Sequence, residues 1–135
     1  MIPGNILDAY ALIAFFEDEP GADFVRELLV EAESGAIKLA MTVVNLGEIR
    51  YSIARAVSAA QADLYVQEIR GMSIEIVDAN WPLTHQAAIY KSEGGISYAD
   101  CFAAALAKLR EAELVTADPE LKKLGNEITI VWENG

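Results

Sequence analysis

Four acidic residues have the type and placement that phosphate chemistry requires: Asp8, Glu48, Asp100 and Asp118. Asp8 and Asp118 each follow a strand-like segment and precede a helical one, and in parallel α/β sheets sites form outside the carboxyl ends of the strands. We therefore expect the two residues at the carboxyl ends of adjacent strands. If the four acids converge there, their carboxylates repel one another unless a hard cation neutralises them. Oxygen-only ligands favour Mg²⁺ or Mn²⁺ over zinc. Such a cation can activate water and stabilise the leaving oxygen in phosphodiester hydrolysis.

Each acid also has a simpler structural interpretation. Asp8 and Asp118 precede helices and are typical N-cap residues. Asp100 stands three residues after Ser97, which is the spacing of a capping box. Glu48 lies inside an apolar helical segment, where a carboxylate is costly if it is buried and ordinary if it faces solvent. The residues taken one by one leave both interpretations open.

The segments that must position these acids alternate between strand and helix patterns. Short apolar or alternating runs predict strands at 5–8, 37–41, 74–77, 114–116 and 127–132. Helical spacing with capping residues predicts helices at 9–18, 22–33, 42–57, 58–71, 81–92, 97–112 and 119–124. Strands separated by helices indicate an α/β fold, a three-layer sandwich around a mainly parallel sheet of four or five strands.

Length and composition indicate one globular domain. The chain has 135 residues, of which 53% are hydrophobic and 23% charged, so we expect a single domain over residues 1–135. The longest apolar stretches are far shorter than the roughly 20 residues of a membrane span, and we expect no membrane partner. The segment Met1–Asn5 lacks the basic region of a signal peptide, and Cys101 is the single cysteine. These features favour a cytoplasmic location.

The charge balance is unusual for a protein that acts on nucleic acid. The chain has 10 Lys and Arg residues against 21 Asp and Glu residues, a formal net charge of −11. That charge repels RNA and DNA at long range. A carboxylate-held cation would reverse the sign of the potential where a phosphate docks. Strong acidity also suits a basic protein partner.

Four segments in order along the chain resemble the PIN-domain endoribonucleases, especially the VapC-type toxins of toxin-antitoxin pairs. They are LDAYALIAFFEDEPGA at 7–22, VVNLGEIRYSIAR at 43–55, ISYADCFAAALA at 96–107 and LVTADPEL at 114–121. The first segment, and the Tyr-Ala-Asp helix start followed later by Thr-x-Asp, are specific when taken together. The chain departs from many relatives at Ala9, where they have Thr or Ser, and at Leu121, where they have Phe.

The resemblance implies a PIN-like nuclease domain that uses Mg²⁺ or Mn²⁺, an RNA substrate, a cognate antitoxin and a homodimer. It places the ligands of the metal and of water at Asp8, Glu48, Asp100 and Asp118. Thr116 matches a hydroxyl residue that holds a metal-bound water or a carboxylate, and Asn45 matches a polar neighbour of the Glu. A plain strand residue at Thr116 and a first-turn residue at Asn45 are equally good interpretations.

Three other assignments compete with this one. A response-regulator receiver needs paired acids at its first strand, which Ile6-Leu7-Asp8 does not provide, and a haloacid-dehalogenase-like phosphatase needs Asp-x-Asp, where this chain has Tyr10. The third is a PIN-like binding module without catalysis, against which the presence of all four acids argues. Five basic residues are candidates for phosphate contact or simply solvated: Arg50, Arg55, Lys91, Lys108 and Arg110.

Overall fold

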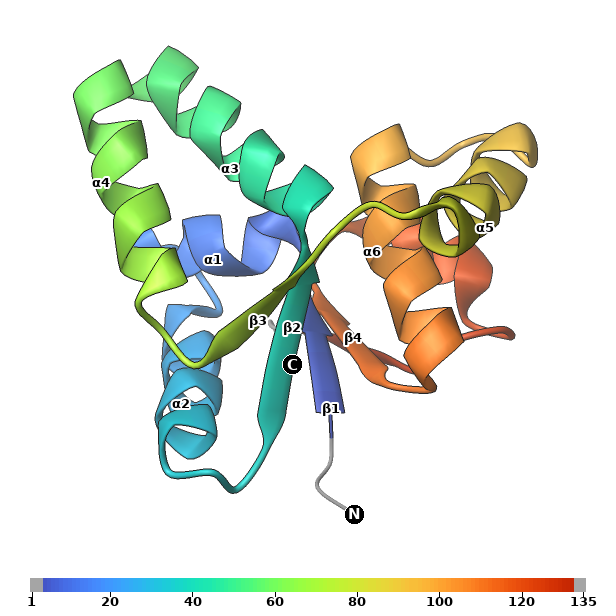
Figure 1. Ribbon diagram of the computed structural model, residues 1–135, viewed down its shortest axis with the longest axis horizontal. Coiled ribbons are helices and arrows are strands. Elements are labelled where there is room, and N and C mark those ends of the chain that lie inside the picture. The colour runs from blue at the N-terminus through green and yellow to red at the C-terminus, as the bar shows by residue number, and fades with distance from the viewer. Residues whose placement is uncertain (1–3, 133–135) are drawn as a thin grey trace.

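A five-stranded parallel sheet forms the middle layer of the computed structural model, which describes residues 4–132 (Figure 1). The strands are β1 (Gly4–Leu7), β2 (Lys38–Thr42), β3 (Ile74–Val77), β4 (Glu113–Thr116) and β5 (Ile130–Trp132). Their order across the sheet is β3-β2-β1-β4-β5, and every neighbouring pair is parallel. The predicted sandwich with a mainly parallel sheet is therefore confirmed, and β1 lies at its centre.

Helices cover both faces of the sheet. One layer contains α1 (Ala9–Phe16), α2 (Ala22–Glu33), α3 (Val43–Ala56) and α4 (Ala59–Arg70), and the other contains α5 (Trp81–Ser92), α6 (Tyr98–Arg110) and the 3₁₀ helix η1 (Pro119–Leu124). Successive strand residues alternate between the two faces. Ile6 and Leu114 pack under α5 and α6, whereas Leu7 and Val115 pack under α1 to α3. The hairpin of α3 and α4 extends beyond the carboxyl edge of the sheet (Figure 1).

Side-chain caps fix where most helices begin. Thr42, Ser58 and Ser97 each accept a hydrogen bond from the backbone N–H three residues later, as predicted for these positions. Asn80 caps α5 in the same way, through the N–H of Leu83. Because these caps define the first turns of α3 and α6, they also set the positions of the acids that those two helices carry.

The last predicted strand, 127–132, is too long. The backbone N–H groups of Glu127 and Ile128 donate to the carbonyl of Leu124, at 2.9 and 3.1 Å, and thus continue the turn after η1. Only residues from Ile130 onward are left to pair with β4. The helices predicted at 9–18 and 97–112 also end earlier, at Phe16 and at Arg110.

Two further predictions concern the chain as a whole. One is the single domain over residues 1–135, and the other is the expectation that Met1–Asn5 is no signal peptide. Both ranges include terminal residues that lie outside the described range. Within that range, none of the helices has the length and apolar character needed to cross a membrane.

Candidate metal and active site

Asp8 and Asp118 follow adjacent strands, as predicted. Asp8 comes directly after β1 and Asp118 two residues after the end of β4, and these strands pair in parallel with Leu7 opposite Val115. Glu48 lies on α3, which begins where β2 ends, and Asp100 lies near the start of α6. Four separate elements therefore bring one acid each to the carboxyl edge of the sheet.

Asp8 is fully buried and uses both of its carboxylate oxygens. Oδ1 accepts a hydrogen bond from the N–H of Ala11 at 2.9 Å and so caps α1, while Oδ2 accepts one from the Thr116 hydroxyl. The capping interpretation is thus correct, but it accounts for only one oxygen. Burial raises the pKa of Asp8 to about 7, an effect that the two hydrogen bonds oppose and the charges of Glu48 and Asp118 increase.

Thr116 links the ends of the two strands. Its fully buried hydroxyl donates to Asp8 Oδ2 and accepts a hydrogen bond from the backbone N–H of Asp118 at 3.0 Å. A single hydroxyl therefore fixes one acid by its carboxylate and another by its backbone. A strand Thr that only packed would make neither bond.

Asp118 begins η1. Its Oδ1 accepts a hydrogen bond from the N–H of Glu120 at 2.9 Å, and Pro119 occupies the first helical position, where no N–H is needed. The capping interpretation of Asp118 is therefore also correct. The side chain is only half-buried, so it reaches both the buried carboxylates and the solvent edge of the site.

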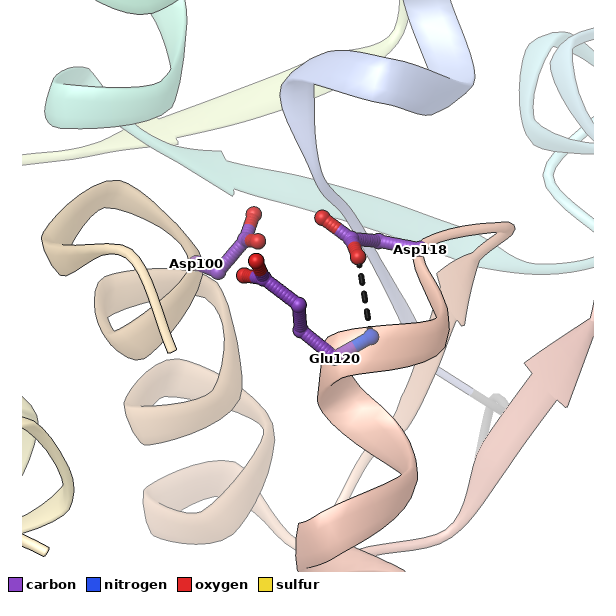
Figure 2. Close-up of side chains that lie close together, drawn as sticks. All are labelled: Asp100, Asp118 and Glu120. Carbon is purple, nitrogen blue, oxygen red and sulfur yellow. Dashed lines mark hydrogen bonds between the residues drawn. The ribbon is translucent and has the colours of Figure 1, made fainter. Parts of the chain in front are cut away.

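Asp100 lies in the first turn of α6 and is 6% exposed. Its backbone N–H donates to the Ser97 hydroxyl at 3.2 Å, but the reciprocal bond of a capping box, from Ser97 N–H to the Asp100 carboxylate, is absent from the described residues. The carboxyl group points instead toward those of Asp118 and Glu120 (Figure 2). Burial, and then the neighbouring carboxyl of Asp118, raise the pKa of Asp100 well above its ordinary value.

Glu48 is half-buried, and its Oε1 atom is shielded from solvent. Within residues 4–132 no hydrogen bond reaches that atom. Burial is the main reason that the pKa of Glu48 is raised; the side-chain amide of Asn45 opposes this effect, and the charge of Asp118 adds to it. A buried oxygen without a partner is costly, and this atom is free to accept a hydrogen bond from water or to bind a cation.

Asn45 connects α3 to α6. It is fully buried, its Oδ1 accepts from the Thr42 hydroxyl at 2.6 Å, and its Nδ2 donates to the carbonyl of Ala99 at 3.1 Å. Ala99 immediately precedes Asp100, and Asn45 lies one helical turn before Glu48. The side chain thus positions two helices that each carry an acid.

Glu120 is a further acid at this edge, and the sequence interpretation did not include it. Its carboxylate and those of Asp100 and Asp118 each have an oxygen within 4.8 Å of the others (Figure 2). The sequence signal is weak, because an acid two residues after Asp118 is equally typical of a first helical turn. The packing of η1 against α6 brings it close to Asp100.

Three of the five candidate basic residues form hydrogen bonds within the chain, with groups other than the four acids of the site. Arg50 donates to Asp63 at 2.7 Å, and Arg110 binds Glu75 through two hydrogen bonds of 2.7 and 2.8 Å. Lys91 donates to a backbone carbonyl at 3.0 Å. These contacts favour the solvated or structural interpretation of the three residues.

A hollow of about 450 Å³ lies at the opposite edge of the sheet. It is lined by Gly4, Lys38 and Glu113, where β1, β2 and β4 begin, and by Arg110 at the end of α6. Parallel strands separate this edge from the one that carries the acids. The hollow is therefore distinct from the carboxylate site.

An acidic cluster at the carboxyl edge of a parallel sheet defines the class of site, a carboxylate centre suited to a divalent cation. The profile of the PIN domain family matches residues 6–127, and the chain belongs to that family. No curated protein matches the sequence.

Several solved structures of other proteins share the fold of this chain. DNA-bound VapBC from Salmonella typhimurium superposes with a TM-score of 0.76 at 16% identity, covering 98% of this chain and 99% of the other. VapBC-5 from Mycobacterium tuberculosis, a member of the VapBC family of toxin-antitoxin systems, gives 0.62 at 23% identity, with 96% of each chain covered. VapC20 of the same organism, a toxin that cleaves the sarcin-ricin loop, gives 0.65 at 12% identity, covering 82% and 86%.

Proposed function

We propose that this protein is a metal-dependent endoribonuclease, the toxin of a toxin-antitoxin pair. The observation that carries the proposal is the convergence of Asp8, Glu48, Asp100 and Asp118 from four separate elements at one edge of the sheet. Capping accounts for one oxygen of Asp8 and one of Asp118, and leaves the carboxylates of Asp100 and Glu48 unexplained. A PIN domain that had lost catalysis would not need these buried charges.

The residues fit Mg²⁺ or Mn²⁺. Every donor in the cluster is an oxygen, as hard cations require, and Glu48 Oε1 is buried without a partner among the described residues. We assign Asp8, Glu48, Asp100 and Asp118 as the residues that hold the ion. When bound, the ion supplies charge neutralisation and Lewis acidity toward the phosphate and the attacking water.

The protein's own groups supply the positioning. Hydrolysis joins a water oxygen to phosphorus and breaks one ester P–O bond, so a proton leaves the water and another reaches the leaving ribose oxygen. Thr116 holds the Asp8 carboxylate in one orientation, and Asn45 fixes the spacing of the helices that carry Glu48 and Asp100. Such preorganised carboxylates lose no energy to rearrangement when the phosphate arrives.

The substrate we propose is RNA. VapC20, which shares the fold, is a toxin that cleaves the sarcin-ricin loop. The net charge of −11 opposes RNA binding at long range, and the cation reverses the sign of the potential where the phosphate must dock. Binding of RNA to the proposed site therefore depends on the metal.

The partners we propose are a cognate antitoxin and a second copy of the chain. The acidic surface of this protein suits an antitoxin with a basic segment, and VapBC-5 is a member of a toxin-antitoxin family. A small basic protein that co-purifies with this chain would support the first partner. A monomeric mass by light scattering at micromolar concentration would contradict the second.

The decisive experiment compares the parent with Asp100→Asn on a structured RNA, with Mn²⁺ and with EDTA. We expect cleavage by the parent with metal, none in EDTA, and none by the variant under either condition. Equal cleavage by parent and variant, or cleavage by the parent in EDTA, would mean that the mechanism is wrong. A stable, metal-binding protein that cleaves none of a broad panel of RNAs would instead favour the silent PIN-like module.

A further inference from the structure

Four large aromatic side chains are exposed in the described part of the chain: Tyr10, Tyr51, Trp81 and Tyr98. Each of the three tyrosines stands within three residues of an acid of the proposed site, and each belongs to a different helix. Trp81 lies on α5, which carries none of these acids. The exposed tyrosines therefore gather around the carboxyl edge of the sheet.

The first turns of two helices hold two of these rings at that edge. Tyr10 lies in the turn of α1 that Asp8 caps. Tyr98 is the first residue of α6, two positions before Asp100. Its ring packs edge-on against that of Phe102, with 5.0 Å between the ring centroids. This contact supports one side of the Tyr98 ring, while 45% of the residue stays exposed.

Tyr51 lies on α3, one helical turn after Glu48. Residues three apart are neighbours on the surface of a helix, so the two side chains share one side of α3. Because α3 begins at the end of β2 and extends beyond the carboxyl edge, Tyr51 is farther from the sheet than Glu48 (Figure 1). The third ring thus lies on the outer side of the site.

The remaining two tyrosines have internal partners. Tyr65 donates a hydrogen bond to Glu17 at 2.8 Å, and Tyr90, which is buried, donates one to Glu127 at 3.5 Å. Within residues 4–132 the hydroxyls of the three exposed tyrosines make no hydrogen bond. Single exposed apolar residues are ordinary, but several exposed rings around one polar site indicate a ligand with flat apolar faces.

The charges of the protein indicate why such rings would be needed for RNA. The net charge is −11, and two of the basic residues, Arg50 and Arg110, are paired with Asp63 and Glu75. Stacking on aromatic side chains needs no positive charge and acts on the faces of unpaired bases. Bases inside a duplex already stack on their neighbours. Stacking therefore contributes affinity that the charges do not, and it favours unpaired nucleotides.

We propose that Tyr10, Tyr51 and Tyr98 stack on unpaired bases near the phosphate that docks at the cation, and that they select single-stranded RNA over duplex. This inference rests on the proposed function for RNA as the ligand. The cation binds a phosphate, which paired and unpaired nucleotides share. The preference for unpaired nucleotides therefore comes from the rings.

The test measures the binding of a fluorescein-labelled oligouridylate by fluorescence anisotropy. Ca²⁺ is present as a hard divalent ion that also takes oxygen ligands. Tyr51→Leu removes the ring but stays apolar, and Tyr51→Phe removes only the hydroxyl; the same pair of variants is made at Tyr10 and Tyr98. We expect each Leu variant to bind about tenfold more weakly than the parent and each Phe variant to match it. Trp81→Leu, which removes an exposed ring from α5, should also match the parent.

Two further strands show whether the bases are recognised. An abasic strand of the same length keeps the phosphates, so it should bind the parent more weakly and should bind the Leu variants equally well as the parent. The oligouridylate paired with oligoadenylate should behave in the same way. Circular dichroism checks the fold of the variants, which should be unchanged because the three side chains are exposed.

The possible outcomes separate this inference from the proposed function. Parental binding by all three Leu variants would overturn the stacking role and indicate that the rings meet a protein partner instead. Equal weakening by Trp81→Leu, or equal losses on the abasic strand and the oligouridylate, would also overturn it. Binding that depends on the rings, without RNA cleavage in Mn²⁺, would overturn the nuclease and leave the stacking role intact. No binding by the parent would overturn the stacking role, and the cleavage assay then decides separately on the proposed function.

Discussion

The hydroxyl of Thr116 donates a hydrogen bond to the carboxylate of Asp8, across the boundary between β1 and β4. The same oxygen accepts the backbone N–H of Asp118, so one side chain fixes the relative positions of two acids. Both residues are fully buried, and water does not compete for these bonds. Thr116 is therefore a positioning residue for the proposed site.

Thr116→Val should weaken Mn²⁺ binding about tenfold at neutral pH. Valine preserves the shape of threonine but removes the hydrogen bond that lowers the pKa of Asp8, so the carboxyl keeps its proton to a higher pH. The Mn²⁺ affinity of the variant should then recover as the pH rises. Thr116→Ser keeps the hydroxyl and should behave like the parent; equal affinities for Val and Ser at every pH would contradict this role.

Asp8→Asn should abolish RNA cleavage without unfolding the protein, because an Asn side chain also caps helices. Asp8→Ala should abolish cleavage as well, and should be about 1 kcal/mol less stable than Asp8→Asn, because the bond to Ala11 N–H is lost. Denaturant unfolding without metal measures this difference. If Asp8→Asn keeps parental activity while Asp8→Ala unfolds, Asp8 acts only as a cap.

Asn45→Ala should reduce both stability and metal affinity. It removes the bond to the half-buried Ala99 carbonyl and the acceptor of the Thr42 hydroxyl, which keeps only its cap bond from the backbone N–H of residue 45, and this costs about 1 to 3 kcal/mol. Loosening α3 from α6 should also disperse Glu48 and Asp100. Urea unfolding and Mn²⁺ calorimetry together check the two effects, and lower stability with unchanged Mn²⁺ affinity would limit Asn45 to a structural role.

Local signals account for what the sequence predicted well. Thr42, Ser58 and Ser97 cap their helices through bonds that span three residues, so their effect is visible in the sequence itself. The placement of Asp8 and Asp118 after strands follows in the same way. Their adjacency was predicted from the general geometry of α/β folds and agrees with the observed pairing of β1 with β4.

The remaining features depend on packing between distant segments. Asn45 bonds to a carbonyl 54 residues away, and Glu120 approaches Asp100 only because η1 packs on α6. The residues near 127 and 128 have the composition of a strand, but their N–H groups bond to Leu124. Propensity and spacing contain no information on these tertiary contacts, and the four acids indicated by the resemblance to PIN domains do not include Glu120.

The last prediction concerns pH and metal together. In the metal-free protein the pKa of Asp8 is about 7 rather than 3.8, and that of Asp100 is also raised, mainly by burial. Between about pH 4 and 7 the folded protein therefore binds more protons than the unfolded chain, and its free energy of unfolding must fall as the pH rises. The slope is at most about 1.4 kcal/mol per pH unit for each carboxyl.

Urea unfolding in EDTA from pH 5 to 8 should show this loss, and Asp100→Asn should be more stable than the parent at pH 8. Saturating Mn²⁺ should reverse the trend, because it binds the ionised carboxylates of the folded state. Metal-free stability that rises with pH, or an Asp100→Asn variant less stable than the parent at pH 8, would mean that these carboxylates are satisfied without a cation.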